Sequence, residues 1–226
     1  GDDEYLLVRI DNCKPALNIV NVYGEQEGRT GREKVVEKWN RLRKDLDRIK
    51  INGEFCLLVG DFNKKVGNDD LGVKGNHPEI SFGGKLVRNL VASGDYVLVN
   101  NTDIATGGPF TRVDPSNDNK KSCLGLVIVS VNLMPFIMEL VVDKDREFTP
   151  YRVINKGSEL VARYTDHYSI ICTLKDLPSA FQKQETLTKW NLKKPGGWEK
   201  YKLTSDNIAE KVNMIVDNEA DINEVV

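Results

Sequence analysis

The hydrophobic residues of this chain fall mainly into short runs separated by glycine, proline, asparagine and aspartate. This pattern is typical of strands joined by turns. Residues 5–10 and 16–23 are two such runs on either side of the turn-forming stretch 11–15, and they predict a β-hairpin. Further apolar runs predict strands at 55–59, 96–99, 122–130 and 168–174.

Two other stretches carry apolar residues at helical spacing. The first begins with Thr30-Gly-Arg-Glu33, which fits a capping box, in which both side chains bind backbone N–H groups. A helix is therefore expected from residue 30 to residue 49. Its apolar stripe consists of Val35, Val36, Trp39, Leu42, Leu46 and Ile49. The second predicted helix is 85–93, which Gly94 would end.

Polar side chains follow one of the predicted strands directly. The apolar run 55–59 breaks at Gly60 into Asp61 and Asn63. Open α/β sheets place their chemistry at the carboxyl ends of strands, and the two-residue spacing can aim both side chains into one cleft. The alternative is an Asx turn without chemistry. The long polar loop that follows, up to Gly84, favours a binding function.

A second polar pair, Asp166-His167, stands between Thr165 and the predicted strand 168–174. Polar groups again lie at the end of a strand, as they do at Asp61. A surface turn is the alternative interpretation of this pair.

Composition narrows the class of protein without assigning a function. The chain has 226 residues, of which 40% are hydrophobic, enough for one large domain or for a domain with an extension. The net charge of −2 gives no overall basic field. The four cysteines lack C-x-x-C spacing, which favours a reducing, intracellular location, nuclear or cytoplasmic. We expect no membrane association, because neither a signal peptide nor an apolar run of about 20 residues is present.

The character of the sequence changes beyond Pro178. Residues 183–202 hold six lysines and two glutamates, and residues 203–226 hold one lysine and six acidic residues. This change predicts a domain at 1–177, followed by a linker and an amphipathic helical tail at 178–226.

Several of these motifs occur together, in order, in one known family. The chain has Val22-Tyr23, then LLVGDFN at 57–63, then a serine strand motif at 122–130, and finally Thr165-Asp166-His167. In this combination it resembles the endonuclease/exonuclease/phosphatase superfamily, most closely the endonuclease domain of non-LTR retrotransposons. The resemblance implies an α/β (α+β) fold, a four-layer sandwich of two mostly antiparallel β-sheets flanked by helices, incomplete at the amino end. The tail resembles a linker toward a reverse transcriptase region.

The resemblance also implies an activity, the metal-dependent nicking of DNA by phosphodiester hydrolysis. The cofactor would be Mg²⁺ or Mn²⁺, weakly held, and the partner would be DNA. Asp61 would position or deprotonate the attacking water, His167 would donate to a phosphoryl oxygen, and Asp166 would bind the metal. The other residues implied as phosphate or substrate contacts are Tyr23, Asn63, Thr111 and Ser122, of which Tyr23 and Asn63 count as catalytic.

Two departures from the family pattern lower the expected activity. The family has an aspartate behind the catalytic histidine where this chain has Gly125, and the strands that carry the metal-binding glutamate would precede Tyr5. We therefore expect weak activity or none. Two alternatives stay open, a non-catalytic binding protein on the same scaffold and a phosphatase of the same superfamily.

Overall fold

The computed structural model describes residues 5–26, 31–114, 117–149, 151–156 and 159–179. The chain divides into two units, residues 1–182 and 183–226. The helical tail expected from the sequence, and nearly all of the linker before it, lie outside the described residues.

The first sheet has five strands in the order β1-β2-β3-β8-β4. All neighbours in it are antiparallel except β2 and β3, which are parallel. A parallel pair needs a crossover connection, and the long helix α1 provides it. The strands are β1 (Tyr5–Ile10), β2 (Leu17–Tyr23), β3 (Phe55–Asp61), β4 (Tyr96–Leu98) and β8 (Gly125–Ser130). The predicted hairpin 5–23 and the predicted strands at 55–59 and 96–99 are therefore confirmed.

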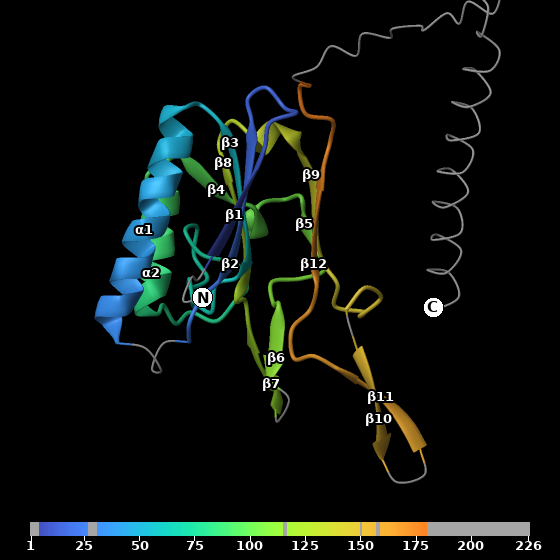
Figure 1. Ribbon diagram of the computed structural model, residues 1–226. Coiled ribbons are helices and arrows are strands. Elements are labelled where there is room, and N and C mark those ends of the chain that lie inside the picture. Colours follow the sequence, from blue (N-terminus) through green and yellow to red (C-terminus); the bar gives the residue numbers. More distant parts are fainter. Residues whose placement is uncertain (1–4, 27–30, 115–116, 150, 157–158, 180–226) are drawn as a thin grey trace, which may run out of the picture. The chain divides into compact units, whose positions relative to one another are not determined.

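Both α-helices of the described residues, α1 (Arg32–Ile51) and α2 (Phe82–Ala92), cover one face of this sheet (Figure 1). The predicted capping box is wrong, because the residue before α1 is Gly31, which makes no side-chain cap hydrogen bond, and Thr30 lies outside the described residues. Helix α2 begins earlier than predicted, with the Ser81 hydroxyl accepting the Gly84 N–H. Gly84 packs against the backbone of Lys65. A Cβ at Gly84 would lie 1.8 Å from the Lys65 carbonyl oxygen, which explains why a glycine occurs within the helix.

A second sheet packs on the other face, with three strands in the order β12-β9-β5. These are β5 (Ala105–Thr106), β9 (Ile137–Val142) and β12 (Ile170–Leu174). In β3, Cys56 and Leu58 face the helices, while Phe55 and Leu57 face this second sheet. The expected α/β fold with two mostly antiparallel sheets flanked by helices is confirmed. Of the four expected layers, the described part of the chain contains three: helices, sheet and sheet.

Two hairpins complete the described elements. One is formed by β6 (Arg112–Asp114) and β7 (Asn117–Ser122), the other by β10 (Tyr151–Lys156) and β11 (Glu159–Tyr164). The predicted strand 122–130 is in fact two strands, because β7 ends at Ser122 and β8 begins at Gly125. Short 3₁₀ helices at Val99–Asn101 and Met134–Phe136 join the remaining strands.

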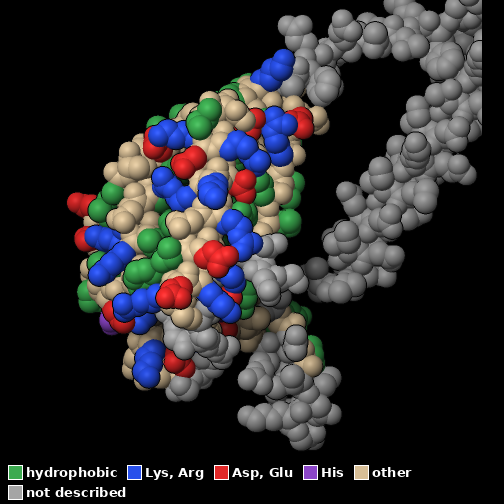
Figure 2. All heavy atoms as spheres, turned by 60° about the vertical axis from the view of Figure 1, so that its left-hand side comes forward, with side chains coloured by type: hydrophobic (Ala, Val, Ile, Leu, Met, Phe, Trp, Pro, Cys, Tyr) green, Lys and Arg blue, Asp and Glu red, His purple; other side chains and the backbone are tan. Residues whose placement is uncertain are grey.

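Charged side chains of both signs are mixed on the surface that includes the helices. Figure 2 shows lysine and arginine interspersed with aspartate and glutamate on this face. On α1 the ion pairs include Arg41 with Glu37 and Arg48 with Asp45. Such a surface gives no continuous basic patch for nucleic acid. None of the helices that the structure describes is both long and apolar enough to span a membrane.

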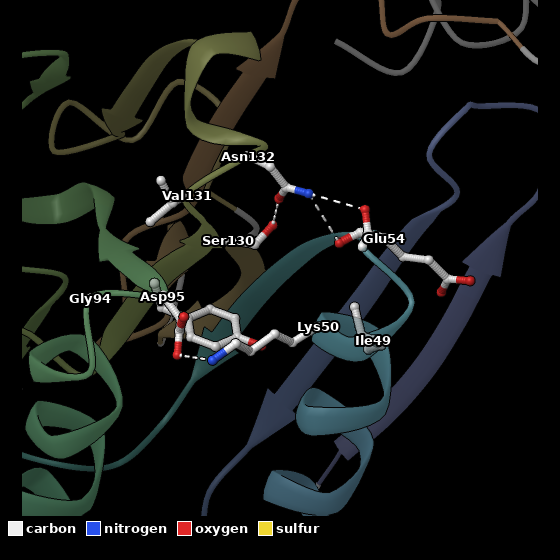
Figure 3. Close-up of a pocket in the computed structure, with 10 residues that line it drawn as sticks. Ile49, Lys50, Glu54, Gly94, Asp95, Ser130, Val131 and Asn132 are labelled. Carbon is white, nitrogen blue, oxygen red and sulfur yellow. Dashed lines mark hydrogen bonds and ion pairs between the residues drawn. The ribbon is translucent and has the colours of Figure 1, made fainter.

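A polar pocket of about 300 Å³ lies where α1 ends, β3 begins and β8 ends (Figure 3). The Lys50 ammonium and the Asp95 carboxylate lie 2.6 Å apart in it. The Asn132 amide donates to the Gly53 carbonyl at 3.2 Å, and the Ser130 hydroxyl donates to Asn132 at 2.6 Å. We call this hollow the Lys50 pocket.

Candidate functional site

At the opposite end of the five-stranded sheet, β2 and β3 end beside the start of β8. Tyr23 and Asp61 are cross-strand partners in β2 and β3, and Asp61 is in turn opposite Gly125 in β8. Side chains alternate along a strand, so all three positions share the face of Phe55 and Leu57, toward the second sheet. The parallel pairing of β2 and β3 therefore brings Tyr23 and Asp61 to the same place.

Backbone geometry at the end of β3 depends on Gly60. Its φ of +140° is a conformation that other residues rarely adopt, and a Cβ there would lie 2.1 Å from the Val22 carbonyl oxygen. The glycine lets β2 and β3 stay paired up to Asp61. Two residues later, Asn63 has a φ of +50°.

Asn63 is held by two hydrogen bonds. Its backbone N–H donates to Asp61 Oδ1 at 2.9 Å, and its side-chain amide donates to the Gly24 carbonyl at 2.6 Å. The Asx turn considered from the sequence is therefore present, and it lies beside a pocket. Because the amide already holds Gly24, a role in binding phosphate is left to its second N–H.

Strand β6 positions the Asp166-His167 pair. Arg112 forms a single β-bridge with His167. The Val113 N–H donates to the Asp166 carbonyl, and the Tyr168 N–H donates to the Thr111 carbonyl, both at 2.9 Å. This pairing fixes the segment just before β12 against the β6–β7 hairpin, which the sequence pattern did not predict.

A second set of contacts supports the same segment from the other side. Asp143 is buried and accepts hydrogen bonds from the N–H groups of Glu147 and Phe148 and from the Thr149 hydroxyl. The Thr149 hydroxyl in turn accepts the Ser169 N–H at 3.1 Å. Burial raises the pKa of Asp143, but the hydrogen bonds from Thr149, Phe148 and Glu147 outweigh burial and hold this pKa below its usual value.

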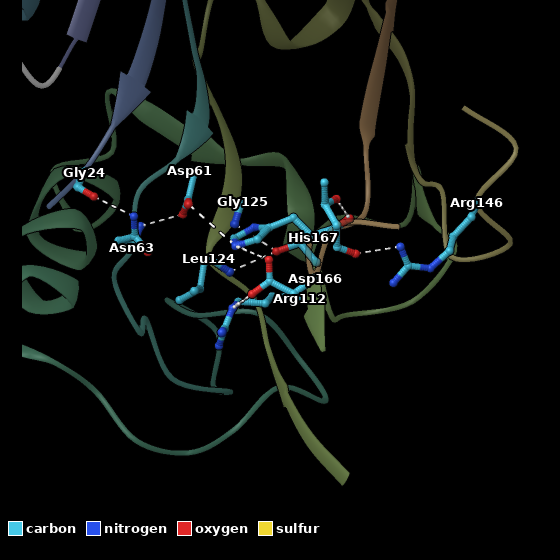
Figure 4. Close-up of polar contacts among 11 residues, drawn as sticks. Gly24, Asp61, Asn63, Arg112, Leu124, Gly125, Arg146, Asp166 and His167 are labelled. Atoms are coloured by element: carbon cyan, nitrogen blue, oxygen red, sulfur yellow. Dashed lines mark hydrogen bonds and ion pairs between the residues drawn. The ribbon is translucent and has the colours of Figure 1, made fainter. Parts of the chain in front are cut away.

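Two carboxylates converge on one imidazole in the resulting pocket (Figure 4). His167 Nε2 lies 3.8 Å from Asp61 Oδ2 and 3.9 Å from Asp166 Oδ1. These distances exceed ordinary hydrogen bonds, and all three side chains are between 21% and 32% exposed. The pocket has a volume of about 610 Å³. We call it the His167 pocket.

Most of the site residues expected from the sequence line the His167 pocket. They are Tyr23, Asp61, Asn63, Thr111, Asp166 and His167. Tyr23 is 72% exposed at the rim. Gly125 also lines the pocket, and a Cβ there would lie 2.6 Å from Ile170 Cδ1.

Two of the expected substrate contacts serve the backbone instead. Thr111 is 1% exposed, and its hydroxyl accepts the N–H groups of Leu124 and Gly125 at 2.9 and 2.8 Å. Ser122 does not line the pocket, and its carbonyl accepts the Thr111 N–H at the base of the β6–β7 hairpin. Both residues therefore support the pocket wall, and a substrate contact by Ser122 stays a prediction.

Arg112 is the residue of this pocket that sequence reasoning missed. Its Nε donates to Asp166 Oδ2 at 2.7 Å. The sequence contains only one hint, an arginine directly after Thr111 in a polar, turn-rich stretch. Nothing in that stretch predicts pairing with residues far downstream.

The donors present do not fit a bound divalent metal. Asp166 is paired with Arg112, and Asp61 accepts the Asn63 N–H. Magnesium is usually held by several oxygen ligands with regular geometry. Within the described ranges, no group of three or more His, Cys, Asp or Glu side chains could hold a metal ion.

Comparisons with known proteins find likeness in structure alone. No family model matches the sequence, and no curated protein does. The chain is similar to the 3′-phosphatase NExo from Neisseria, solved with a product DNA hairpin, at 17% identity and a TM-score of 0.52, over 77% of this chain and 66% of that one. It is also similar to the catalytic domain of APE2 from Xenopus laevis, at 18% identity and a TM-score of 0.50, over 79% and 57% of the two chains.

A third similar structure is the 3′-5′ exonuclease NExo from Neisseria meningitidis, at 17% identity and a TM-score of 0.51, over 76% and 66% of the two chains. The chain spans about half to two thirds of the length of the solved structures it matches. At these identities the likeness shows the fold alone. The described residues share the fold of these three solved structures.

Proposed function

We propose that the His167 pocket is a phosphodiester site that acts on a nucleic-acid strand, with DNA as the first candidate, and hydrolyses it slowly. The observation that carries this proposal is the convergence of the Asp61 and Asp166 carboxylates on His167 Nε2 at the ends of the central strands. General acid–base chemistry needs such groups within reach of one reacting centre. The fold, which nucleases and phosphatases share, supports a phosphoester as the substrate.

The side chains present can supply the proton transfers that hydrolysis requires. Attack of water on phosphorus breaks a P–O bond, so one group must take a proton from water and another must give one to an oxygen. Asp61 can orient or deprotonate the water, and His167 can donate to a phosphoryl oxygen or to the leaving oxygen. Two carboxylates beside an anionic ester repel it, and one arginine offsets only part of this charge. Turnover is therefore expected to be slow.

That the domain derives from a retroelement is also a proposal. The motif combination from Val22-Tyr23 to Thr165-Asp166-His167 supports an endonuclease domain of non-LTR retrotransposon type, and the tail supports a continuation into a reverse transcriptase region. Magnesium enters no step here, because the donors of the pocket do not fit it. The second candidate, binding without hydrolysis, is favoured by the Arg112–Asp166 pair and by Gly125 opposite Asp61.

The test is nicking of supercoiled plasmid by the full chain, with and without added Mg²⁺. We expect slow nicking that falls by about 10²-fold or more in both Asp61→Asn and His167→Gln, since each removes one proton-transfer group. Asp95→Asn is the matched control, because it makes the same change in the Lys50 pocket and should leave the rate unchanged. A nicking rate that neither site variant lowers would overturn the proposal. Oligonucleotide binding without nicking would favour the second candidate.

A further inference from the structure

Arg112 lies where two hollows of the surface meet. It lines the His167 pocket and also a neighbouring one of about 390 Å³. Gln26 and Asn63 line both as well, so the two hollows adjoin along these three residues. The second hollow extends to Lys65 and to Ser81 at the start of α2. A strand laid across both hollows passes over Arg112.

The guanidinium of Arg112 is only partly engaged. Its Nε donates to Asp166 Oδ2 at 2.7 Å, and the side chain is 31% exposed. Among the described residues, no group accepts a hydrogen bond from its two terminal nitrogens. A guanidinium presents five N–H donors in a planar fork that matches phosphate oxygens, so four donors remain for a ligand.

Asp166 is the carboxylate that the family resemblance assigns to the metal, and here it holds an arginine. The backbone bridge between Arg112 and His167 fixes Arg112 beside the imidazole. The pocket thus contains a cation of its own at the place where a metal ion was expected. Resting on the proposed function, we propose that Arg112 anchors a phosphate group of the nucleic-acid strand and that this anchoring needs no divalent metal.

The ion pair suits this role physically. Asp166 holds the guanidinium through Nε, so both terminal nitrogens remain for a bidentate contact with phosphate oxygens. A lysine would place a single point charge there without the fork. The Asp166 carboxylate therefore has two opposite effects. It orients Arg112 for phosphate binding, but its negative charge competes with the phosphate for Arg112 and weakens that binding.

The first experiment measures binding of a short fluorescein-labelled single-stranded DNA oligonucleotide to the full chain by anisotropy, in EDTA and in Mg²⁺. We expect Kd values in the two conditions to agree within about threefold. Arg112→Gln should weaken binding about tenfold in EDTA, as expected for losing a charged hydrogen-bond pair. Arg48→Gln on α1 removes the same charge from an exposed ion pair and should change Kd by less than about twofold.

Asp166→Asn separates an arginine anchor from a metal site. Asparagine keeps an oxygen for Arg112 Nε but removes the competing charge, so binding in EDTA should become severalfold tighter. A metal-ligand role for Asp166 predicts weaker binding that depends on Mg²⁺. Circular dichroism and the thermal transition establish that each variant folds.

The outcomes distinguish the two proposals. Binding that requires Mg²⁺ and is unaffected by Arg112→Gln overturns the arginine anchor and leaves the proposed function standing. Absence of oligonucleotide binding in both conditions overturns the proposed function and this inference with it.

Discussion

The two ends of the five-stranded sheet both carry polar pockets, but their side chains are used differently. In the Lys50 pocket, Lys50 and Asp95 form a close ion pair, and Asn132 and Ser130 are bound to each other and to the backbone (Figure 3). In the His167 pocket, two carboxylates face an imidazole at distances too long for hydrogen bonds (Figure 4). Asp166 does have a close partner in Arg112, but the His167 imidazole lies beyond hydrogen-bond distance of both carboxylates and is therefore available to a ligand.

This difference shows that polar content does not identify a functional site. Both hollows contain charged side chains and both lie at strand ends. What distinguishes the His167 pocket is that its imidazole lies beyond hydrogen-bond distance of both carboxylates, while backbone pairing holds the segment that carries it. The four free cysteines give no further candidate for a functional site. Burial raises the pKa of the Cys56 thiol to about 12, so this thiol is a poor nucleophile.

The largest expected difference between the two ends concerns glycine. Gly60→Ala places a Cβ 2.1 Å from the Val22 carbonyl oxygen at a φ of +140°, and should lower the free energy of unfolding by about 3 kcal/mol or more. Gly94→Ala, beside the Lys50 pocket, meets nothing within 4 Å at a φ of +78° and should cost about 1 kcal/mol. Denaturant midpoints measure both. Equal losses of unfolding free energy in the two variants would show that β2 and β3 can separate near Asp61 at little cost.

Acid should affect the two ends to different extents. The folded pKa of Asp143 is lowered, so its contribution to stability is present above the unfolded value of about 4 and is lost as pH falls through the folded pKa. Asp143→Asn should therefore reduce stability at neutral pH and flatten its decline below about pH 4. The pKa of Asp95 is also lowered, by its hydrogen bond from Lys50. Asp95→Asn should have the smaller effect, because that pair is far more exposed.

Thermal midpoints measured across this pH range compare the two variants. Asp143 is expected to support Ser169 through Thr149. If Asp95→Asn lowered the thermal midpoint at neutral pH as much as Asp143→Asn does, this expectation would be contradicted.

The smallest expected effect is that of Lys50→Gln. Lys50 is exposed and its partner Asp95 is partly exposed, and such ion pairs often contribute nothing measurable. We expect an unchanged thermal midpoint within error and unchanged oligonucleotide affinity. A loss of affinity would mean that both ends of the sheet contact the ligand.

Most elements were predictable because the hydrophobic period defines them locally. The first hairpin and strand β3 follow from short apolar runs between turn-forming residues, and helix α1 follows from apolar residues at helical spacing. The start of α2 was missed because Gly83 and Gly84 are poor helix formers, and the place of Gly84 depends on close packing against Lys65.

The site was predictable only in part, for a related reason. Asp61 and His167 could be assigned from their positions at strand ends and from the motif combination. Arg112 and the backbone role of Ser122 depend on the pairing of β6 with β7 and with the segment before β12. Such pairing joins residues distant in the chain, and the short polar runs involved carry no periodic signal.

The β-bridge between Arg112 and His167 also has a consequence for the order of folding. Strands β1, β2 and β3 pair with one another within the first part of the chain, so they can associate early, although β3 also pairs later with β8. The His167 pocket brings together Asp61 and His167, which are more than 100 positions apart in the sequence, and distant pairings form slowly. On the ribosome, a nascent chain would therefore acquire its hydrophobic core well before its binding pocket, and the pocket would close only once β12 had emerged.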